Sequence, residues 1–299
     1  MSQQSSVSVL TAVGIGAGLT TFKMIAAALS GSAGVLAEGI HSLIDTVNNG
    51  LLYLGQRLSK VPPDEEHQYG HGMELYFWTL VVAMLLFVLG GLASIAEGVS
   101  RVISPPELND VGWSFAALGT SFVLNSITWV VAFREFRQGQ GKKTFVEAVH
   151  KSKDPSLLTV LFEDTASIAG VLVAATGLGL AIAFDRPEID GIASIIVGTL
   201  LCIVGYGLMR QSKKLLLGES GTEELANSVR DKVARNPAVA DLVDLRSMHL
   251  SSDDILVTMK LRFKDDLPAQ DVAHTAKRLE DDIRQDHPEC QHIYIAAAE

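Results

Sequence analysis

Residues 37–45 read AEGIHSLID, and they place charged and metal-binding side chains inside a long apolar segment. A carboxylate near the centre of a bilayer costs about 2.5 kcal/mol or more, so it persists only when it is paired, neutralised or bound to a cation. His41 and Asp45 are four residues apart and therefore share one face of a helix. An imidazole and a carboxylate one turn apart form half of a four-ligand metal site, and the other half must come from elsewhere.

The composition fits a membrane bundle followed by a small soluble domain, since the 299 residues are 48% hydrophobic and have a positive mean hydropathy. Six apolar stretches reach the length of about 20 residues that a bilayer crossing requires. They are Val7–Leu29, Gly34–Leu54, Leu75–Val99, Val111–Phe133, Leu157–Phe184 and Ile189–Met209. We expect a membrane domain over residues 1–215 and a second domain over residues 216–299, where the composition becomes polar.

The second domain has a clear order of elements. Thr222–Arg235 has the apolar spacing of a helix, with Thr222 as its cap, and a second helix is expected from Pro268 to about Gln285. Val239–Leu250, Ile255–Phe263 and His292–Ala297 read as strands. This order predicts a small antiparallel sheet with helices on one face. The expected fold class is an all-α six-helix transmembrane bundle followed by a small α+β (α-β-β-α-β) cytoplasmic domain.

Charge limits the partners and the topology. The net charge of −10 argues against nucleic acid as a partner. Basic residues gather in the loops after the second, fourth and sixth apolar stretches, which predicts that both termini are cytoplasmic. The loop after the fourth stretch holds Arg134, Arg137, Lys142, Lys143, Lys151 and Lys153. We expect no cleaved signal peptide, and the two cysteines, Cys202 and Cys290, support neither a disulfide framework nor a cysteine zinc site.

The fifth apolar stretch holds the other acids of the proposed site, Glu163 and Asp164. We favour a metal or proton pathway over a purely structural polar cluster, because buried carboxylates need a cation, protons or several hydrogen bonds. Glu163 and Asp164 are about 100° apart on a helix, so both cannot point ideally at one ion unless the helix is tilted or distorted. Glu163 is therefore either a direct ligand or a group outside the ligand shell. Ser42, Asn48, Asn49 and Ser167 are candidates for a supporting role, although packing at a helix contact is the favoured interpretation.

A second candidate metal site lies in the loop after the second stretch. Asp64, His67 and His71 are spaced three and four residues apart, so a compact turn would bring together three of zinc's four ligands. A solvated polar loop is an equally weighted interpretation from the spacing alone.

The chain resembles the cation diffusion facilitator family over nearly its whole length. The resemblance is carried by GVLAEGIHSLID (residues 34–45), HQYGHG (67–72) and VISPP (102–106), and FEDTA (162–166) looks most like the branch containing zinc transporter nine. It implies that His41, Asp45 and Asp164 belong to the transport site. The family's fourth ligand falls on Val160, which cannot coordinate a metal, and Glu163 is the obvious substitute. Asp64, His67 and His71 match a loop zinc site of bacterial members.

The resemblance implies a homodimeric antiporter in a lipid bilayer, expected in a bacterial cytoplasmic membrane, that exports a divalent cation in exchange for protons. Zinc is the first expectation, and an oxygen-rich shell would favour manganese, iron or magnesium, with cobalt also open. The positions of a second metal site in the tail correspond to Met259, Ala296 and Ala298, so we expect dimerisation without it. The alternatives are a metal sensor or scaffold and a metalloenzyme; we expect no enzyme, because no His-Glu-x-x-His motif is present.

Overall fold

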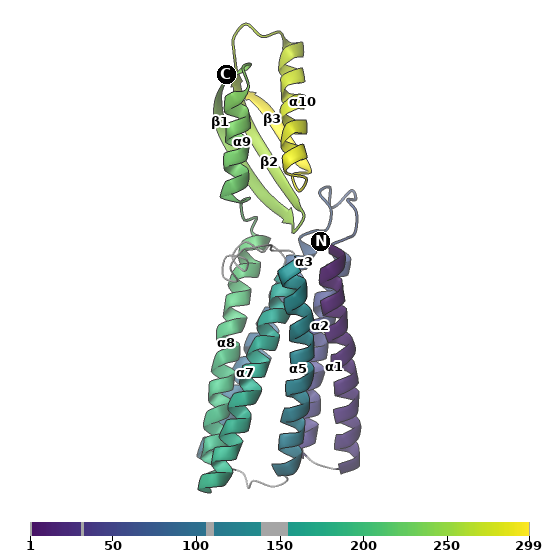
Figure 1. Ribbon diagram of the computed structural model, residues 1–299, viewed down its shortest axis with the longest axis vertical. Helices are drawn as coiled ribbons and strands as arrows, with labels where there is room; N and C mark the ends of the chain where they lie inside the picture. The colour runs from purple at the N-terminus through teal and green to yellow at the C-terminus, as the bar shows by residue number, and fades with distance from the viewer. Residues whose placement is uncertain (1, 31–32, 106–110, 139–154, 299) are drawn as a thin grey trace. The chain divides into compact units, whose positions relative to one another are not determined.

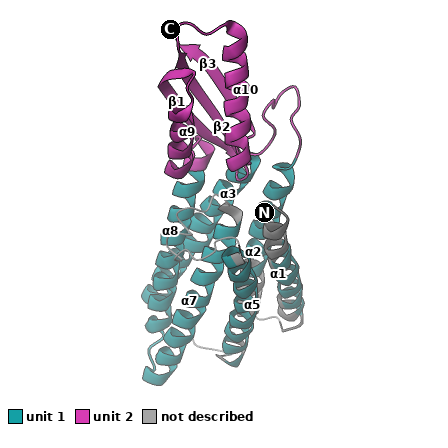
Figure 2. Ribbon diagram, turned by 45° about the horizontal axis from the view of Figure 1, so that its top comes forward, with its two compact units in different colours: residues 1–60, 74–213 teal, residues 61–73, 214–299 magenta. Residues whose placement is uncertain are grey.

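The computed structural model describes residues 2–30, 33–105, 111–138 and 155–298, and the chain divides into two compact units. The first unit comprises Met1–Lys60 and Glu74–Lys213, and the second comprises Val61–Met73 and Lys214–Glu299. Figure 2 colours the two units separately. The loop of residues 61–73 therefore belongs to the same unit as the C-terminal region, although the two are far apart in sequence. The division expected from the sequence, with its boundary at residue 215, counts this loop as part of the membrane domain.

The first unit is a bundle of long helices (Figure 1). The helices are α1 (Ser2–Ser30), α2 (Ala33–Leu58), α3 (Glu74–Leu85), α4 (Ala93–Ile103), α5 (Val111–Gln138), α7 (Pro155–Phe184) and α8 (Glu188–Leu216). A π-helical segment, η1 (Leu86–Leu92), joins α3 to α4. Each of the six predicted apolar stretches lies in a helix, and the third stretch corresponds to α3, η1 and α4 together.

Four helical segments among the described residues are long and apolar enough to cross a bilayer. They are Glu74–Ile103, Ser114–Arg137, Leu157–Phe184 and Glu188–Leu216. In the part of α1 that was searched, the apolar stretch is the shorter Val13–Phe22. The buried side chains of α2 include the polar Ser42, Asn48 and Gln56, whereas the apolar Leu43 and Val47 are exposed. Six crossings remain a prediction, whereas the mostly helical architecture is confirmed.

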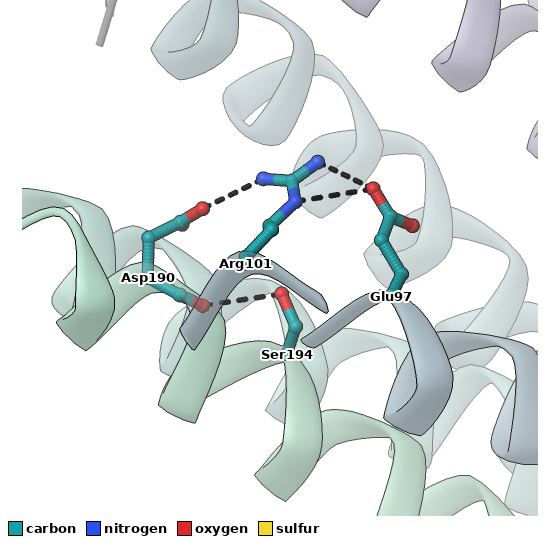
Figure 3. A network of polar contacts seen from close by, with 4 residues as sticks. All are labelled: Glu97, Arg101, Asp190 and Ser194. Atoms are coloured by element: carbon teal, nitrogen blue, oxygen red, sulfur yellow. Dashed lines mark hydrogen bonds and ion pairs between the residues drawn. The ribbon is translucent and has the colours of Figure 1, made fainter. Parts of the chain in front are cut away.

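α8 packs against η1 and α4 with almost no space between the backbones. A Cβ added to Gly98 would lie 2.7 Å from the carbonyl oxygen of Gly191, and one added to Gly198 would lie 2.7 Å from that of Gly91. The same pair of helices is joined by a polar network (Figure 3), in which Arg101 donates to Asp190 Oδ2 at 2.7 Å and also pairs with Glu97. Glycine is required here because any side chain would push the helices apart.

The second unit contains α9 (Glu223–Arg235), β1 (Val239–Ser251), β2 (Asp254–Phe263), α10 (Ala269–Asp286) and β3 (His292–Ala298). The element order is as predicted, and the Thr222 hydroxyl caps α9 by accepting from the Leu225 N–H at 3.2 Å. Both helices cover one face of the sheet, because Val229 and Ile283 share a core with the alternate β2 residues Val257 and Leu261.

The prediction of a purely antiparallel sheet is wrong. β1 and β2 are antiparallel, but β2 and β3 are parallel, in the order β1-β2-β3. The physical reason is the connection between β2 and β3, which runs through α10. This helical crossover returns the chain to the end of the sheet at which β2 began, so β2 and β3 run in the same direction.

Candidate metal sites

Three carboxylates of the first unit lie together. Asp45 of α2 is close enough to Glu163 and Asp164 of α7 for its charge to act on both. The two α7 acids also act on each other. The structure therefore brings together the acids of the second and fifth apolar stretches. Three carboxylates at this separation repel one another unless protons or a cation neutralise them.

The Glu163 side chain is buried next to the Asn48 side chain. It is 6% exposed, and neither carboxylate oxygen has a hydrogen-bond partner among the described residues. Asp164 Oδ2 also has no hydrogen-bond partner among the described residues, although the Thr128 side chain lies next to the Asp164 carboxyl group. Buried oxygens without a donor are costly, and a bound cation removes that cost.

Val160 is part of the apolar packing between helices. It is 2% exposed and belongs to a cluster with Leu52 of α2 and Ala132 of α5. This position thus contributes to the core and offers no metal-binding atom. Glu163, three residues further along α7, is the side chain that joins the acidic cluster. The 100° separation of Glu163 and Asp164 does not keep them apart, since both come close to Asp45.

His41 lies in α2, one turn before Asp45. Its side chain is outside the described part of the structure, so its place in the metal shell rests on the helical spacing. The basic residues Lys142, Lys143, Lys151 and Lys153 also lie outside the described residues.

The loop cluster of the second unit consists of Asp64, His67 and His71. One ligand atom from each residue lies within 4.8 Å of the others. His71 Nε2 is 2.9 Å from Asp64 Oδ2, and His67 Nδ1 is 3.5 Å from Asp64 Oδ1. A chain reversal at Gly70, where φ is 81°, brings His71 back to Asp64.

Hydrogen bonds hold the Asp64 carboxylate in its ionised form. The hydrogen bond with His71, and then the one from the His67 backbone N–H, lower the pKa of Asp64 to about 2. An ionised carboxylate beside two imidazoles is a suitable set for zinc with one coordination position left open. The loop is solvent-accessible, with half of the Asp64 side chain exposed, so a metal can reach it directly.

A second set of contacts fastens this loop to the sheet of the same unit. The Tyr69 ring meets the His292 ring edge-on, with centroids 5.1 Å apart, and the Tyr69 side chain is hydrogen-bonded to Tyr294. His292 Nε2 in turn lies 3.3 Å from Asp254 Oδ2. No local sequence pattern connects Tyr69 with His292, because the two residues are far apart in the chain.

Comparison with known proteins agrees with both units. The family described as "Cation efflux transmembrane domain" matches residues 9–217, and the one described as "Cation efflux protein, cytoplasmic domain", named for dimer formation, matches residues 222–296.

Two relatives illustrate the range of the similarity. The mouse protein "Proton-coupled zinc antiporter SLC30A9, mitochondrial" is 34% identical over 81% of this chain and 42% of its own length. The chain thus spans less than half of that relative. The "Manganese efflux system protein MneS" of Bacillus subtilis is 22% identical over 94% of this chain and 91% of its own length. On the strength of the two domain matches and the relative at 34% identity, the chain belongs to the cation diffusion facilitator family of membrane cation-efflux transporters and is not an enzyme.

Proposed function

We propose that this protein exports a divalent cation in exchange for protons, through a site made by His41, Asp45, Glu163 and Asp164. The observation that carries the proposal is the cluster of three carboxylates on α2 and α7, in which oxygens of Glu163 and Asp164 have no hydrogen-bond partner among the residues that the structure describes. Such a cluster is stable when it holds either a cation or protons. Metal and protons therefore compete for the same oxygen atoms, and this competition couples their movements.

Zinc is the first candidate for the exported ion, since zinc is named in the relative at 34% identity. Manganese, iron, cobalt and magnesium remain alternatives, and manganese is named in the Bacillus subtilis relative. The loop residues Asp64, His67 and His71 are proposed as a separate zinc site. The C-terminal unit, matched by the family's dimer-named domain, is proposed to form a homodimer. We propose a bacterial cytoplasmic membrane as the location. Six crossings would place both termini on one side of it, and the basic residues of the loops favour the cytoplasmic side.

Proteoliposomes with an internal pH indicator test the proposal. We expect Asp45→Asn and Asp164→Asn each to abolish proton movement driven by a zinc gradient. Glu97→Gln is the matched control, because Glu97 is an exposed carboxylate of α4 that pairs with Arg101 outside the cluster. Coupled flux that persists in both aspartate variants would disprove the proposed site and mechanism.

A metal sensor is the second candidate, and the loop cluster favours it. This cluster lies in the same compact unit as the C-terminal sheet, so metal there could alter that unit without any transport. A sensor would bind zinc saturably at Asp64, His67 and His71 but would move no metal across a vesicle membrane.

A further inference from the structure

One polar side chain beside the carboxylate cluster has no role in the proposed mechanism. Asn48 lies three residues after Asp45 and seven after His41, so all three share one face of α2. Asn48 is 1% exposed, and its Oδ1 has no hydrogen-bond partner among the described residues. Its amide is within reach of the Glu163 carboxylate, but the two groups do not form a hydrogen bond of good geometry.

A structural role at a helix contact does not explain this amide. A buried asparagine that joins two helices does so through hydrogen bonds, and its oxygen would then be satisfied. The adjacent Asn49 shows the contrast: it is partly exposed, and its Nδ2 donates to the Asp45 carbonyl oxygen at 3.1 Å. Asn49 therefore has a partner within its own helix, whereas the buried oxygen of Asn48 has none in the described ranges of the chain.

Asn48 and Asp164 both act on Glu163, and four oxygens of these three side chains have no hydrogen-bond partner in the described part of the chain: Asn48 Oδ1, both carboxylate oxygens of Glu163 and Asp164 Oδ2. We infer that Asn48 is a ligand of the transported cation and raises the preference of the site for manganese over zinc. This inference rests on the proposed transport function. Rotation of the amide about its terminal bond exchanges its two ends, so the side chain can present its oxygen to an ion in the cluster.

The preference follows from the chemistry of the donors. Amide and carboxylate oxygens are hard ligands that suit manganese and magnesium, whereas zinc favours nitrogen and sulfur and is satisfied by about four ligands. An additional oxygen donor fits an ion that accepts about six ligands better than it fits zinc. The amide oxygen also takes up no proton near neutral pH. Asn48 therefore acts on the choice of metal and not on the proton exchange.

The test compares manganese and zinc uptake by the full chain in proteoliposomes. Asn48→Leu removes the donor, Asn48→Asp keeps an oxygen donor, and Asn49→Leu is the matched control. We expect Asn48→Leu to raise the KM for manganese about tenfold, as loss of a group at a metal site does, with a threefold or smaller change for zinc. The pH dependence of zinc uptake should stay as in the wild type. Asn49→Leu should leave the ratio of the two KM values unchanged.

Active Asn48→Leu protein with a wild-type ratio of manganese to zinc KM values would overturn the inference. If Asn48→Leu does not fold, the Asn48→Asp variant provides the test. It should transport manganese with a KM near that of the wild type, and its uptake should gain a new dependence on pH. A manganese KM that rises as much as the zinc KM in Asn48→Asp would also overturn it. These results differ from failure of the proposed function, which would appear as coupled flux in Asp164→Asn.

Discussion

Removing the Tyr69 ring should weaken zinc binding at the loop cluster without touching a ligand. Tyr69 lies between His67 and His71 in sequence, and its ring contacts His292 while its side chain is hydrogen-bonded to Tyr294. These contacts hold the loop against the sheet. In Tyr69→Ala the loop loses this support, so fewer molecules hold the two imidazoles and the Asp64 carboxylate in place before the metal arrives.

The size of the effect follows from the contacts. An edge-to-face ring pair contributes about 0.5–1.5 kcal/mol, and a hydrogen bond contributes about 0.5–1.5 kcal/mol. Both rings are partly in water, with 45% of Tyr69 and 52% of Tyr294 exposed, so the lower halves of these ranges apply. Together the two contacts contribute about 1–2 kcal/mol, so their loss reduces the zinc affinity by at most roughly thirtyfold. Tyr69→Phe keeps the ring contact and should lose about half of that free energy.

The assay is zinc titration against a competing fluorescent chelator, in an Asp164→Asn background that removes the membrane site. Tyr206→Ala is the control, because Tyr206 is a 60% exposed tyrosine of α8 and belongs to the first unit. Asp64→Ala shows the effect of losing a ligand outright. Zinc affinity within twofold of the background in Tyr69→Ala, alongside a large loss in Asp64→Ala, would refute the idea that the contact with the sheet organises the loop.

Further outcomes are expected at three residues. Glu163→Gln should change the order in which zinc, manganese, iron, cobalt and magnesium compete for uptake, because it replaces a charged donor by a neutral one; an unchanged order would move Glu163 out of the ligand shell. Cys290 is buried, and its pKa is raised to about 12, so the native thiol should resist alkylation at pH 8. Because an unfolded thiol ionises near pH 9, the wild type should also lose more stability between pH 9 and 12 than Cys290→Ala does, as melting curves can measure. Gly98→Leu should lower the melting temperature and the yield of folded protein, because its side chain would collide with α8, whereas Gly112→Leu, in open space on α5, should change neither.

The sequence predicted elements whose signals are local and failed where distant residues decide. The helix at Glu223–Arg235 was predicted correctly because its cap and its apolar spacing lie within the helix itself. The direction of β3 was predicted wrongly, because the alternation of apolar residues shows which face of a strand is buried but not which way the neighbouring strand runs.

The acidic cluster shows a different limit of sequence reasoning. Helical geometry separates Glu163 from Asp164 by about 100°, yet both lie close enough to Asp45 for its charge to act on them. The contact of Tyr69 with His292 had no sequence signal at all. It depends on the loop of residues 61–73 folding together with a domain that begins about 140 residues later.

The two proposed metal sites differ in chemistry, and this difference bears on the role that we propose for each. The loop cluster has two imidazoles and one carboxylate and is open to solvent, which suits zinc. The acidic cluster of α2 and α7 has three carboxylates and a neighbouring amide, of which Glu163 and Asn48 are buried, and these oxygen donors suit harder ions as well. If the loop merely passed its ion to the membrane site, the two clusters would be expected to favour the same metal. Because the donor sets differ, we favour a role in which zinc stays bound in the loop and organises it. The acidic cluster of α2 and α7 would then determine independently which ion is exported.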